Sequence, residues 1–162
     1  MRRVHQCFVF SLNRHGSAAA AICLLLATPV FAQPYRYSAD GSEVTDSKTG
    51  LIWRRCSEGQ TWNGSTCAGT ALDYTHEQAL VHAQTQAGWR LPNVKELTSI
   101  VDRSRSDPAI DPTAFPATST RWYWTSSPDA GRVDSVWMVG FYVGYVSNYS
   151  RGPETFYVRL VR

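Results

Sequence analysis

The segment from residue 141 to residue 156 contains the side chains best suited to binding a ligand. It brings tyrosine, asparagine, serine and arginine together in one short stretch that also contains Gly144 and Gly152. Tyrosine offers a large contact area at a small cost in conformational entropy, and asparagine and serine adapt their hydrogen bonds, so binding loops favour this composition. We predict a ligand-binding site made of these residues and one earlier tryptophan: Trp122, Tyr142, Tyr145, Asn148, Tyr149, Arg151 and Glu154.

A second interpretation of this segment is an ordinary hairpin whose tyrosines lie on its solvated face. Successive side chains of a strand point to opposite faces. If Val143 and Val146 face the core, the tyrosines at 142 and 145 cannot both do so. Both interpretations therefore place tyrosine at the surface, and they differ in whether a ligand binds there.

Two nearby histidines, His76 and His82, could in principle hold a metal ion beside Glu77. They are six residues apart, which is about 240° around a helix of ~3.6 residues per turn. Their imidazoles therefore cannot face one ion from one side of a helix, as the two histidines of the zinc-binding H-E-x-x-H motif do. We expect both to be solvated on a helix surface, and we predict no metal site and no cofactor.

Paired carboxylates would point to a glycosidase, which needs two acids roughly 5–10 Å apart. Ser126 and Ser127 lack the G-x-S-x-G context of a nucleophilic serine. We therefore expect no enzymatic activity, and a polysaccharide hydrolase is the least favoured alternative. The candidate carboxylates lie near turns, where aspartate satisfies backbone donors, and no spacing pairs any two of them: Asp102, Asp107, Asp111, Asp129 and Asp134.

Residues 1–32 have the pattern of a signal peptide. Basic residues up to Arg14 accompany an apolar run at residues 18–30 that is shorter than a membrane span. The sequence VFA at residues 30–32 predicts cleavage before Gln33. We expect a mature domain of residues 33–162, exported to the periplasm or out of the cell, with no membrane span after cleavage.

Cleavage at this site would remove the net charge of the chain. Three of the 16 Lys and Arg residues lie in the signal segment, which has no Asp or Glu, so 13 basic residues remain against 13 acidic ones. The formal charge of +3 for the whole chain therefore falls to zero. Because non-specific nucleic-acid binding depends on a positive field, we predict no nucleic-acid partner.

Cys56 and Cys67 are the two cysteines outside the signal segment. In an exported protein such a pair is expected to form a disulfide. It would close a loop of about twelve residues and stabilise the fold by about 3 kcal/mol in the chain-entropy model. Zinc is the alternative, but it needs four ligands at short spacing and the chain has no C-x-x-C motif.

The order of elements predicts an α+β fold, because a strand at residues 51–54 precedes two helices and then further strands. A capping box begins the first helix at Thr75, and Gly88 stands just past its end. Asn93 caps the second helix, which we expect to end between residues 103 and 107. The later strands are expected to be antiparallel and to lie at residues 122–126, 136–141, 143–149 and 156–162.

Other conspicuous side chains are expected to build the scaffold. Arg90, between Trp89 and Leu91, is expected to be partly buried and to bind a carboxylate or loop carbonyls. Glu96 is expected to close the cap of the second helix. Four tryptophans are assigned mostly to the core, because large aromatic side chains supply much of a small domain's buried surface: Trp53, Trp89, Trp124 and Trp137.

Five short motifs follow one another within residues 40–162: TGLIW at 49–53, WRLPNVKEL at 89–97, DPAID at 107–111 with Phe115 and Pro116, YWTSS at 123–127, and YVRLVR at 157–162. Each motif alone is weak, and five of them in order are specific. In these motifs the chain resembles the family of Lcl C-terminal domains, named after the C-terminal domain of a bacterial collagen-like adhesin.

The resemblance implies a C-type-lectin-like fold with two helices, a small twisted antiparallel sheet and long loops. It also implies export, and the founding adhesin is similar to a trimeric binder of sulfated glycans, so a homo-oligomer is among the expected partners. Two features depart from that picture. The neutral mature chain does not favour a sulfated polymer, and Leu91 stands where a calcium-dependent lectin has an acidic residue before Pro-Asn.

These observations predict an exported, adhesin-like binding module without catalytic activity, whose partner is a glycan or a protein. The alternative is a structural or assembly protein of the cell envelope, in which the same aromatic surface packs against an identical subunit.

Overall fold

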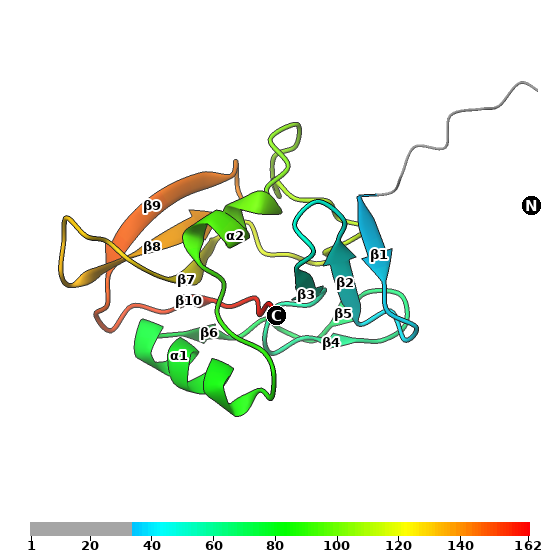
Figure 1. Ribbon diagram of the computed structural model, residues 1–162, viewed down its shortest axis with the longest axis horizontal. Helices are drawn as coiled ribbons and strands as arrows, with labels where there is room; N and C mark the ends of the chain where they lie inside the picture. Colours follow the sequence, from blue (N-terminus) through cyan, green and yellow to red (C-terminus); the bar gives the residue numbers. More distant parts are fainter. Residues whose placement is uncertain (1–33) are drawn as a thin grey trace, which may run out of the picture. The chain divides into compact units, whose positions relative to one another are not determined.

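The computed structural model describes residues 34–162, so the predicted signal peptide at residues 1–32 lies outside the described residues. No helix of the described part is long and apolar enough to cross a membrane. Figure 1 shows the arrangement. In chain order the elements are β1 (Tyr35–Tyr37), β2 (Glu43–Asp46), β3 (Ile52–Arg54), β4 (Thr61–Trp62), β5 (Cys67–Ala68), β6 (Asp73–Tyr74), α1 (His76–Thr85), α2 (Val94–Ser99), β7 (Trp122–Pro128), β8 (Ser135–Gly140), β9 (Tyr145–Ser150) and β10 (Phe156–Tyr157).

A five-stranded sheet, in the order β6-β10-β7-β8-β9, places β9 at one edge. The strands β7, β8 and β9 are antiparallel neighbours, as predicted. The prediction for the last strand was wrong, because β10 ends at Tyr157 and lies parallel to β7, with Tyr157 opposite Tyr123. Instead of forming a hairpin with β9, β10 lies on the far side of β7 and pairs with β6.

The two other sheets are smaller. β1, β2 and β3 form a three-stranded antiparallel sheet, and β4 pairs with β5. Two helices and several antiparallel sheets confirm the predicted α+β class.

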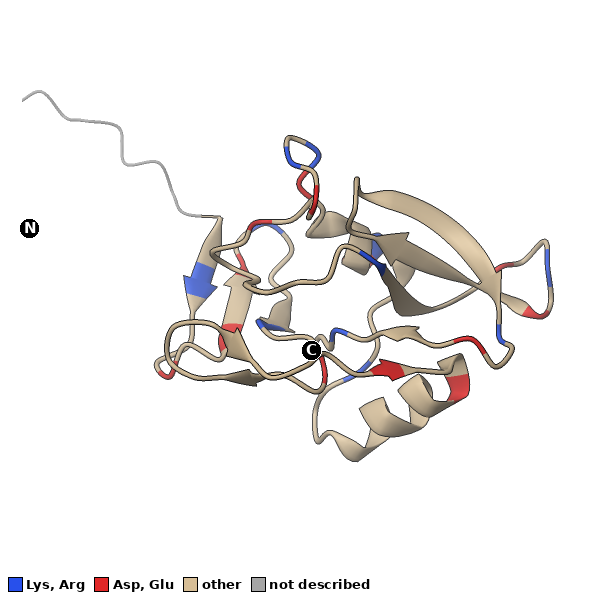
Figure 2. Cartoon of the chain, turned by 180° about the vertical axis from the view of Figure 1, so that it is seen from behind, with Lys and Arg blue, Asp and Glu red and all other residues tan. Residues whose placement is uncertain are grey.

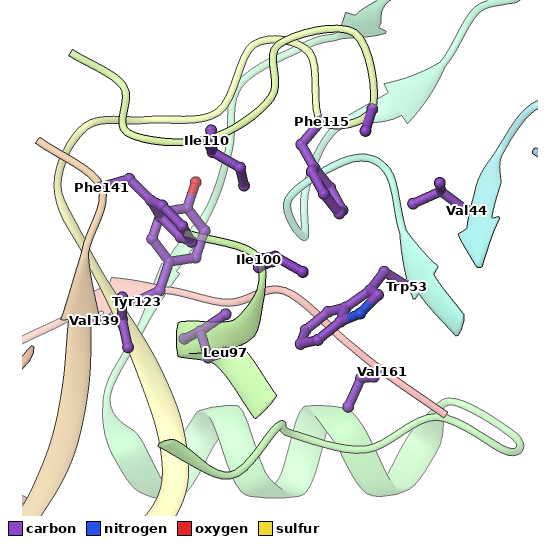
Figure 3. Packing of buried hydrophobic residues seen from close by; sticks show 11 residues of the cluster. Val44, Trp53, Leu97, Ile100, Ile110, Phe115, Tyr123, Val139, Phe141 and Val161 are labelled. Atoms are coloured by element: carbon purple, nitrogen blue, oxygen red, sulfur yellow. The ribbon is translucent and has the colours of Figure 1, made fainter. Parts of the chain in front are cut away.

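The two helices contribute to separate buried clusters, one from each face of the five-stranded sheet. Because successive strand residues point to opposite faces, Tyr123 packs in one cluster with Leu97 of α2, whereas Trp124 packs in the other with Ala79 of α1. Figure 3 shows the first cluster, which gathers side chains from α2, from the sheet strands and from the loop that carries Phe115.

Both helices begin at the predicted caps. The side chain of Thr75 accepts a hydrogen bond from the N–H of Gln78 at the start of α1. The side chain of Asn93 accepts one from the N–H of Glu96 at the start of α2, and the Glu96 carboxylate accepts the N–H of Asn93 in return. These bonds satisfy N–H groups that have no partner within a helix.

The second helix ends at Ser99, before the predicted boundary at residues 103–107. Val101 forms an isolated bridge with Ile110, and the N–H of Asp102 donates to the carbonyl of Ala109. These bonds turn the chain back on itself directly after the helix. The apolar pattern that continues through Val101 therefore belongs to this turn and not to a longer helix.

The predicted disulfide is confirmed, because Cys56 is joined to Cys67 with their Cα atoms 5.4 Å apart. Cys67 begins β5, so the bond fixes the loop of residues 57–66, which contains β4, to the segment that follows β3.

The C-terminal segment joins parts of the chain that are distant in sequence. Arg162 and Ile52 of β3 exchange two backbone hydrogen bonds, and Val161 and Arg90 exchange two more. The last residues therefore lie between β3 and the segment that connects the helices, and they complete the scaffold.

Candidate functional site

The predicted site residues fall into two groups in the structure. Those on β9 are spread along the strand, which advances about 3.4 Å per residue, so the two ends of β9 belong to different hollows. Tyr145, at the start of β9, lies in a cleft of about 200 Å³. We call this cleft the aromatic cleft. It contains three of the predicted residues and is lined by Thr120, Trp122, Gly140, Tyr142, Val143 and Tyr145.

A second hollow lies toward the other end of β9 and is lined by Asn148, Tyr149 and Glu154, among others. The side-chain amide of Asn148 is already engaged, because it donates to Asp129 at 2.6 Å and accepts from Arg132 at 3.3 Å. This hollow therefore offers fewer unengaged polar groups than its sequence suggests.

Tyr149 lines the second hollow but is held there by a packing contact, and Arg151 lies outside both hollows. The ring of Tyr149 packs edge-on against Phe156, with the ring centres 5.3 Å apart. Arg151 is exposed and lines neither the aromatic cleft nor the second hollow.

Gly140 forms the floor of the aromatic cleft. It lies opposite Trp122 on β7 and opposite Tyr145 on β9, so both aromatic side chains stand on the same face of the sheet. A Cβ atom at residue 140 would lie 2.9 Å from Cε3 of Trp122. Because glycine has no Cβ, the indole can lie over the backbone here, and any other residue would displace it.

The polar groups around the aromatic cleft are left to solvent. Tyr142 is 61% exposed and Tyr145 is 68% exposed. Within residues 34–162, neither hydroxyl makes a hydrogen bond, and neither does the indole N–H of Trp122. The neighbouring Trp124, in contrast, donates its indole N–H to the carbonyl of Tyr74 at 2.7 Å.

Sequence reasoning missed Thr120, Gly140 and Val143 as parts of the cleft. A glycine at the end of a strand signals close packing, but its neighbour could be identified only once the strand register was known.

β9 begins at Tyr145 because residues 141–144 form the turn, closed by a hydrogen bond from the N–H of Gly144 to the carbonyl of Gly140. Val143, half-buried in this turn, and the exposed Val146 are not core residues.

The motif at residues 89–97 forms a bonded network. The guanidinium of Arg90 donates to both carboxylate oxygens of Glu96, each at 2.7 Å. This pairing lowers the pKa of Glu96 and raises that of Arg90. Arg90 itself is half-exposed, and its partner is the capping carboxylate of α2, so both residues serve the scaffold.

The arginines of the last motif are also structural. The guanidinium groups of Arg54 and Arg162 both lie over the ring of Trp89, 5.0 and 4.7 Å from its centre. Arg159 is completely buried. It donates to the carbonyls of Arg54 and Arg55 and to the hydroxyl of Thr118.

The core assignment of the four tryptophans was correct for two of them. Trp53 and Trp124 are completely buried. Trp89 and Trp137 are only half-buried. Trp89 lies near the surface because it packs against the charged side chains of Arg54 and Arg162.

The prediction that the two histidines are solvated was wrong for His76, and His82 is only partly exposed. His76 is 4% exposed, and its ring hydrogen-bonds the carbonyl of Thr125 at 3.0 Å. Burial lowers the pKa of His76. The ring of His82 stacks on Tyr74, and its Nε2 lies 2.6 Å from the carboxylate of Glu58. These partners are distant in sequence, so local spacing does not reveal them.

A further cavity of about 290 Å³ lies beside the disulfide and is lined in part by Trp62, Trp89 and Glu58. Glu58 is 6% exposed and accepts from Arg54 at 3.0 and 3.1 Å in addition to its contact with His82. This carboxylate is paired with the guanidinium of Arg54, and its contact with His82 fixes α1 to the segment after β3.

Carboxylates that were considered for hydrolysis are found capping turns. Asp102, Asp111 and Asp129 each accept the backbone N–H of the residue two positions later, at 2.8–2.9 Å. Hydrogen bonds from Ser104 lower the pKa of Asp102. Within the part of the chain that the structure describes, no group of three or more His, Cys, Asp or Glu side chains could hold a metal ion.

Charged residues are absent from the two strands beside the aromatic cleft. β8 and β9 contain no Lys, Arg, Asp or Glu, and Figure 2 shows these strands without blue or red. The loop between β7 and β8 carries Arg132 and Asp134. Nearer the cleft, the exposed Arg121 stands between the lining residues Thr120 and Trp122 without lining the cleft itself.

Comparison with known proteins agrees with the sequence motifs. The family model of the Lcl C-terminal domain matches residues 42–162, a range that contains all five motifs. No curated protein and no solved structure matches the chain. Because the family model covers most of its length, the chain belongs to the family of Lcl C-terminal domains.

Proposed function

We propose that the domain is an exported, adhesin-like binding module that recognises a glycan or a protein through the aromatic cleft and does not catalyse a reaction. Membership of the Lcl C-terminal domain family supports a binding role. The observation that carries the proposal is the cleft, where Trp122, Tyr142 and Tyr145 meet at the surface and their polar groups have no partner among the described residues.

Exposed aromatic side chains gathered on one surface are typical of interaction sites. Tryptophan and tyrosine are also enriched among the residues that dominate binding energy. Tyr145 stands on a strand whose six residues all pair with β8. Its backbone is therefore ordered before a ligand arrives, which reduces the entropic cost of binding.

The hydrogen bonding of the carboxylates supports binding without catalysis. A glycosidase needs one carboxylic acid with a raised pKa and a second free carboxylate in the same cleft. Asp102, Asp111 and Asp129 are hydrogen-bonded in turns, and no carboxylate lines the aromatic cleft. We expect no product release when the protein is incubated with a panel of cell-wall and extracellular polysaccharides.

The fold is assigned, within the same proposal, to the C-type-lectin-like group. The support is the pair of helices, the small antiparallel sheets and the long irregular segment at residues 100–121 between α2 and β7. A crystal structure that superposes on C-type lectin domains with the same strand order would establish this assignment, and a different strand order would reject it.

Export to the periplasm or out of the cell also belongs to the proposal. It is supported by the signal-peptide pattern and by the disulfide, which persists in oxidising compartments. N-terminal sequencing of the protein from periplasmic and culture-medium fractions should begin at Gln33. Recovery of the uncleaved chain from the cytoplasm would contradict export.

A glycan array and a partner pull-down with the mature protein test the binding site. Tyr145→Ala should abolish most binding, whereas Tyr149→Ala removes a tyrosine of the same strand outside the cleft and should retain it. Unchanged binding in both variants would reject the assignment of the site.

A second candidate function is assembly of the envelope through a contact between copies of this chain. The observation that favours it is the open edge of β9, which contains no charged residue or proline to discourage pairing. Light scattering separates the two functions. A stable oligomer that dissociates in Tyr145→Ala would favour assembly, and a monomer in both proteins would favour ligand binding.

A further inference from the structure

We infer that the aromatic cleft is a binding subsite for the ring of an uncharged sugar. This inference rests on the proposed function and names its ligand class. It is drawn from four properties of the cleft: its aromatic walls, its hydrogen-bonding groups, its lack of charge and its size.

The walls of the cleft suit a molecule with a flat C–H surface. The face of an aromatic ring carries partial negative charge, and it attracts the weakly positive C–H groups on one side of a sugar ring. Trp122 leans over Gly140, and Tyr145 stands on the opposite side of the same glycine. The indole itself covers the backbone of Gly140, so a sugar ring would approach the two aromatic side chains in the cleft that both of them line.

The polar groups at the cleft suit hydroxyl groups. The indole N–H of Trp122 is a donor, and the hydroxyls of Tyr142 and Tyr145 can donate or accept. Among residues 34–162 none of these groups has a hydrogen-bond partner. A sugar supplies hydroxyl partners of both kinds at the rim of its C–H surface, so these groups could be paired when it binds.

The absence of charge selects against acidic sugars. None of the six lining residues is charged, and the adjoining strands β8 and β9 carry no charge either. A sulfate or carboxylate that enters such a site would lose part of its hydration, and none of the lining residues offers it a cationic partner. The expected ligand is therefore a neutral saccharide.

The size of the cleft distinguishes a sugar ring from a peptide. Its volume of about 200 Å³ is below the roughly 300–1,000 Å³ of sites that enclose drug-sized ligands. A proline-rich peptide also binds aromatic residues, but it needs a groove that accommodates successive turns of its helix. A single short cleft fits one ring of a longer saccharide chain.

Calorimetric titration of the mature protein with defined probes tests this inference. The neutral probes are cellotetraose, maltotetraose, mannotetraose and tetra-N-acetylchitotetraose, and the comparison probes are a heparin tetrasaccharide and a ten-residue proline peptide. We expect at least one neutral probe to bind, with an affinity that changes little between low and high salt because no ion pair forms. Saturation-transfer NMR should place the ring C–H protons of that probe closest to the protein.

Matched variants locate the binding. Tyr145→Ala should lower the affinity for the neutral probe about tenfold or more, which is the scale of a lost aromatic stacking contact. Tyr145→Phe retains the ring and should lower this affinity less. Tyr149→Ala is the control on the same strand and should bind as the wild type does. Circular dichroism should show that all three variants are folded.

The outcomes separate this inference from the proposed function. Binding of the heparin or proline probe alone, or of no probe, overturns the sugar assignment. If a partner other than a neutral sugar is then found and loses affinity in Tyr145→Ala, the binding site stands and only the ligand class is wrong. If a neutral sugar binds equally well to wild type and Tyr145→Ala, the placement of the subsite is overturned.

Discussion

Two tryptophans show how differently the family motifs and the aromatic cleft are built. Trp89, in the motif at residues 89–97, packs against the guanidinium groups of Arg54 and Arg162. Trp122 lies against the backbone of Gly140, and its indole N–H has no hydrogen-bond partner among the described residues. The charged side chains around Trp89 are paired within the domain, Arg54 with Glu58 and Arg162 with Glu43, whereas the polar groups of the aromatic cleft have no partner among the described residues.

This difference indicates that the residues that identify the family build its scaffold. Arg90 and Glu96 complete the cap of a helix, and Arg159 joins the C-terminal segment to the residues after β3. Tyr142 and Tyr145 lie between the motifs. If this division is correct, substitutions in the scaffold change stability, and substitutions in the aromatic cleft change binding alone.

The largest effect is expected for Arg159→Ala. This change removes the donors to the carbonyls of Arg54 and Arg55 and to Thr118, and it leaves a cavity in the interior. Buried polar groups that lose their partners are costly, so unfolding in urea should show a loss of about 3–5 kcal/mol. The matched control is Arg121→Ala, an exposed arginine, which should change stability by less than about 0.5 kcal/mol. Equal effects would contradict the structural role of Arg159.

Removing the disulfide should have the next largest effect. The double variant Cys56→Ala with Cys67→Ala should lose roughly 2–4 kcal/mol, because its unfolded chain is no longer restricted by the closed loop. Thermal unfolding with and without a reducing agent measures the contribution of the disulfide to stability. The reductant should lower the melting temperature of the wild type and leave the double variant unchanged, and a wild type insensitive to reduction would show that the bond does not stabilise the domain.

The same contrast explains how much of the fold could be predicted from the sequence. Thr75 and Asn93 find their partners three residues away, so both helix starts were predictable. Arg159 finds its partners about 40 and 100 residues away in the chain. Local patterns contain no information on such pairs, which is why His76 was wrongly assigned to a solvated surface.

The composition of the candidate site was predictable, and its geometry was not. Tyr142 and Tyr145 are exposed, as the polar segment around them predicted. Strand alternation is not the reason, because Tyr142 lies in the turn at residues 141–144 and neither Val143 nor Val146 is a core residue. The division of the site depends on where β9 begins. The role of Gly140 depends on the register of three strands, and a one-residue shift would place its neighbours on the other face.

A smaller effect is expected for Glu96→Ala, which removes the cap of the Asn93 N–H and the partner of Arg90. Loss of a cap costs about 1 kcal/mol at pH 7. Because Arg90 lowers the pKa of Glu96 below its ordinary value of 4.5, the charge stabilises the fold above that pH. This contribution is lost as the pH falls through the lower pKa of the folded state.

Urea unfolding of the wild type and Glu96→Ala at pH 7 and pH 2.5 measures this dependence. The difference between the two proteins should shrink at the lower pH. Glu77→Ala, an exposed carboxylate in the first turn of α1, is the control and should have the smaller effect at pH 7. A difference that does not change with pH would contradict the role of the ion pair.

The pH dependence from His76 should be smaller still near neutral pH. Burial lowers its pKa below 6.5, so just below pH 6.5 the unfolded chain binds more protons than the folded one. Stability should therefore be unaffected above pH 6.5 and should fall as the pH drops below it. NMR titration of the His76 ring should give a midpoint under 6.5, and a midpoint at or above that value would contradict its burial.

The smallest effect on stability is expected in the aromatic cleft, where substitutions should change binding and leave the fold intact. The measurement is the free energy of unfolding of the double variant Tyr142→Ala with Tyr145→Ala, compared with the wild type in urea. Both side chains are mostly exposed, so the account predicts a difference of less than about 0.5 kcal/mol. A loss of more than about 2 kcal/mol would show that these tyrosines support the fold and would contradict the division between scaffold and binding surface.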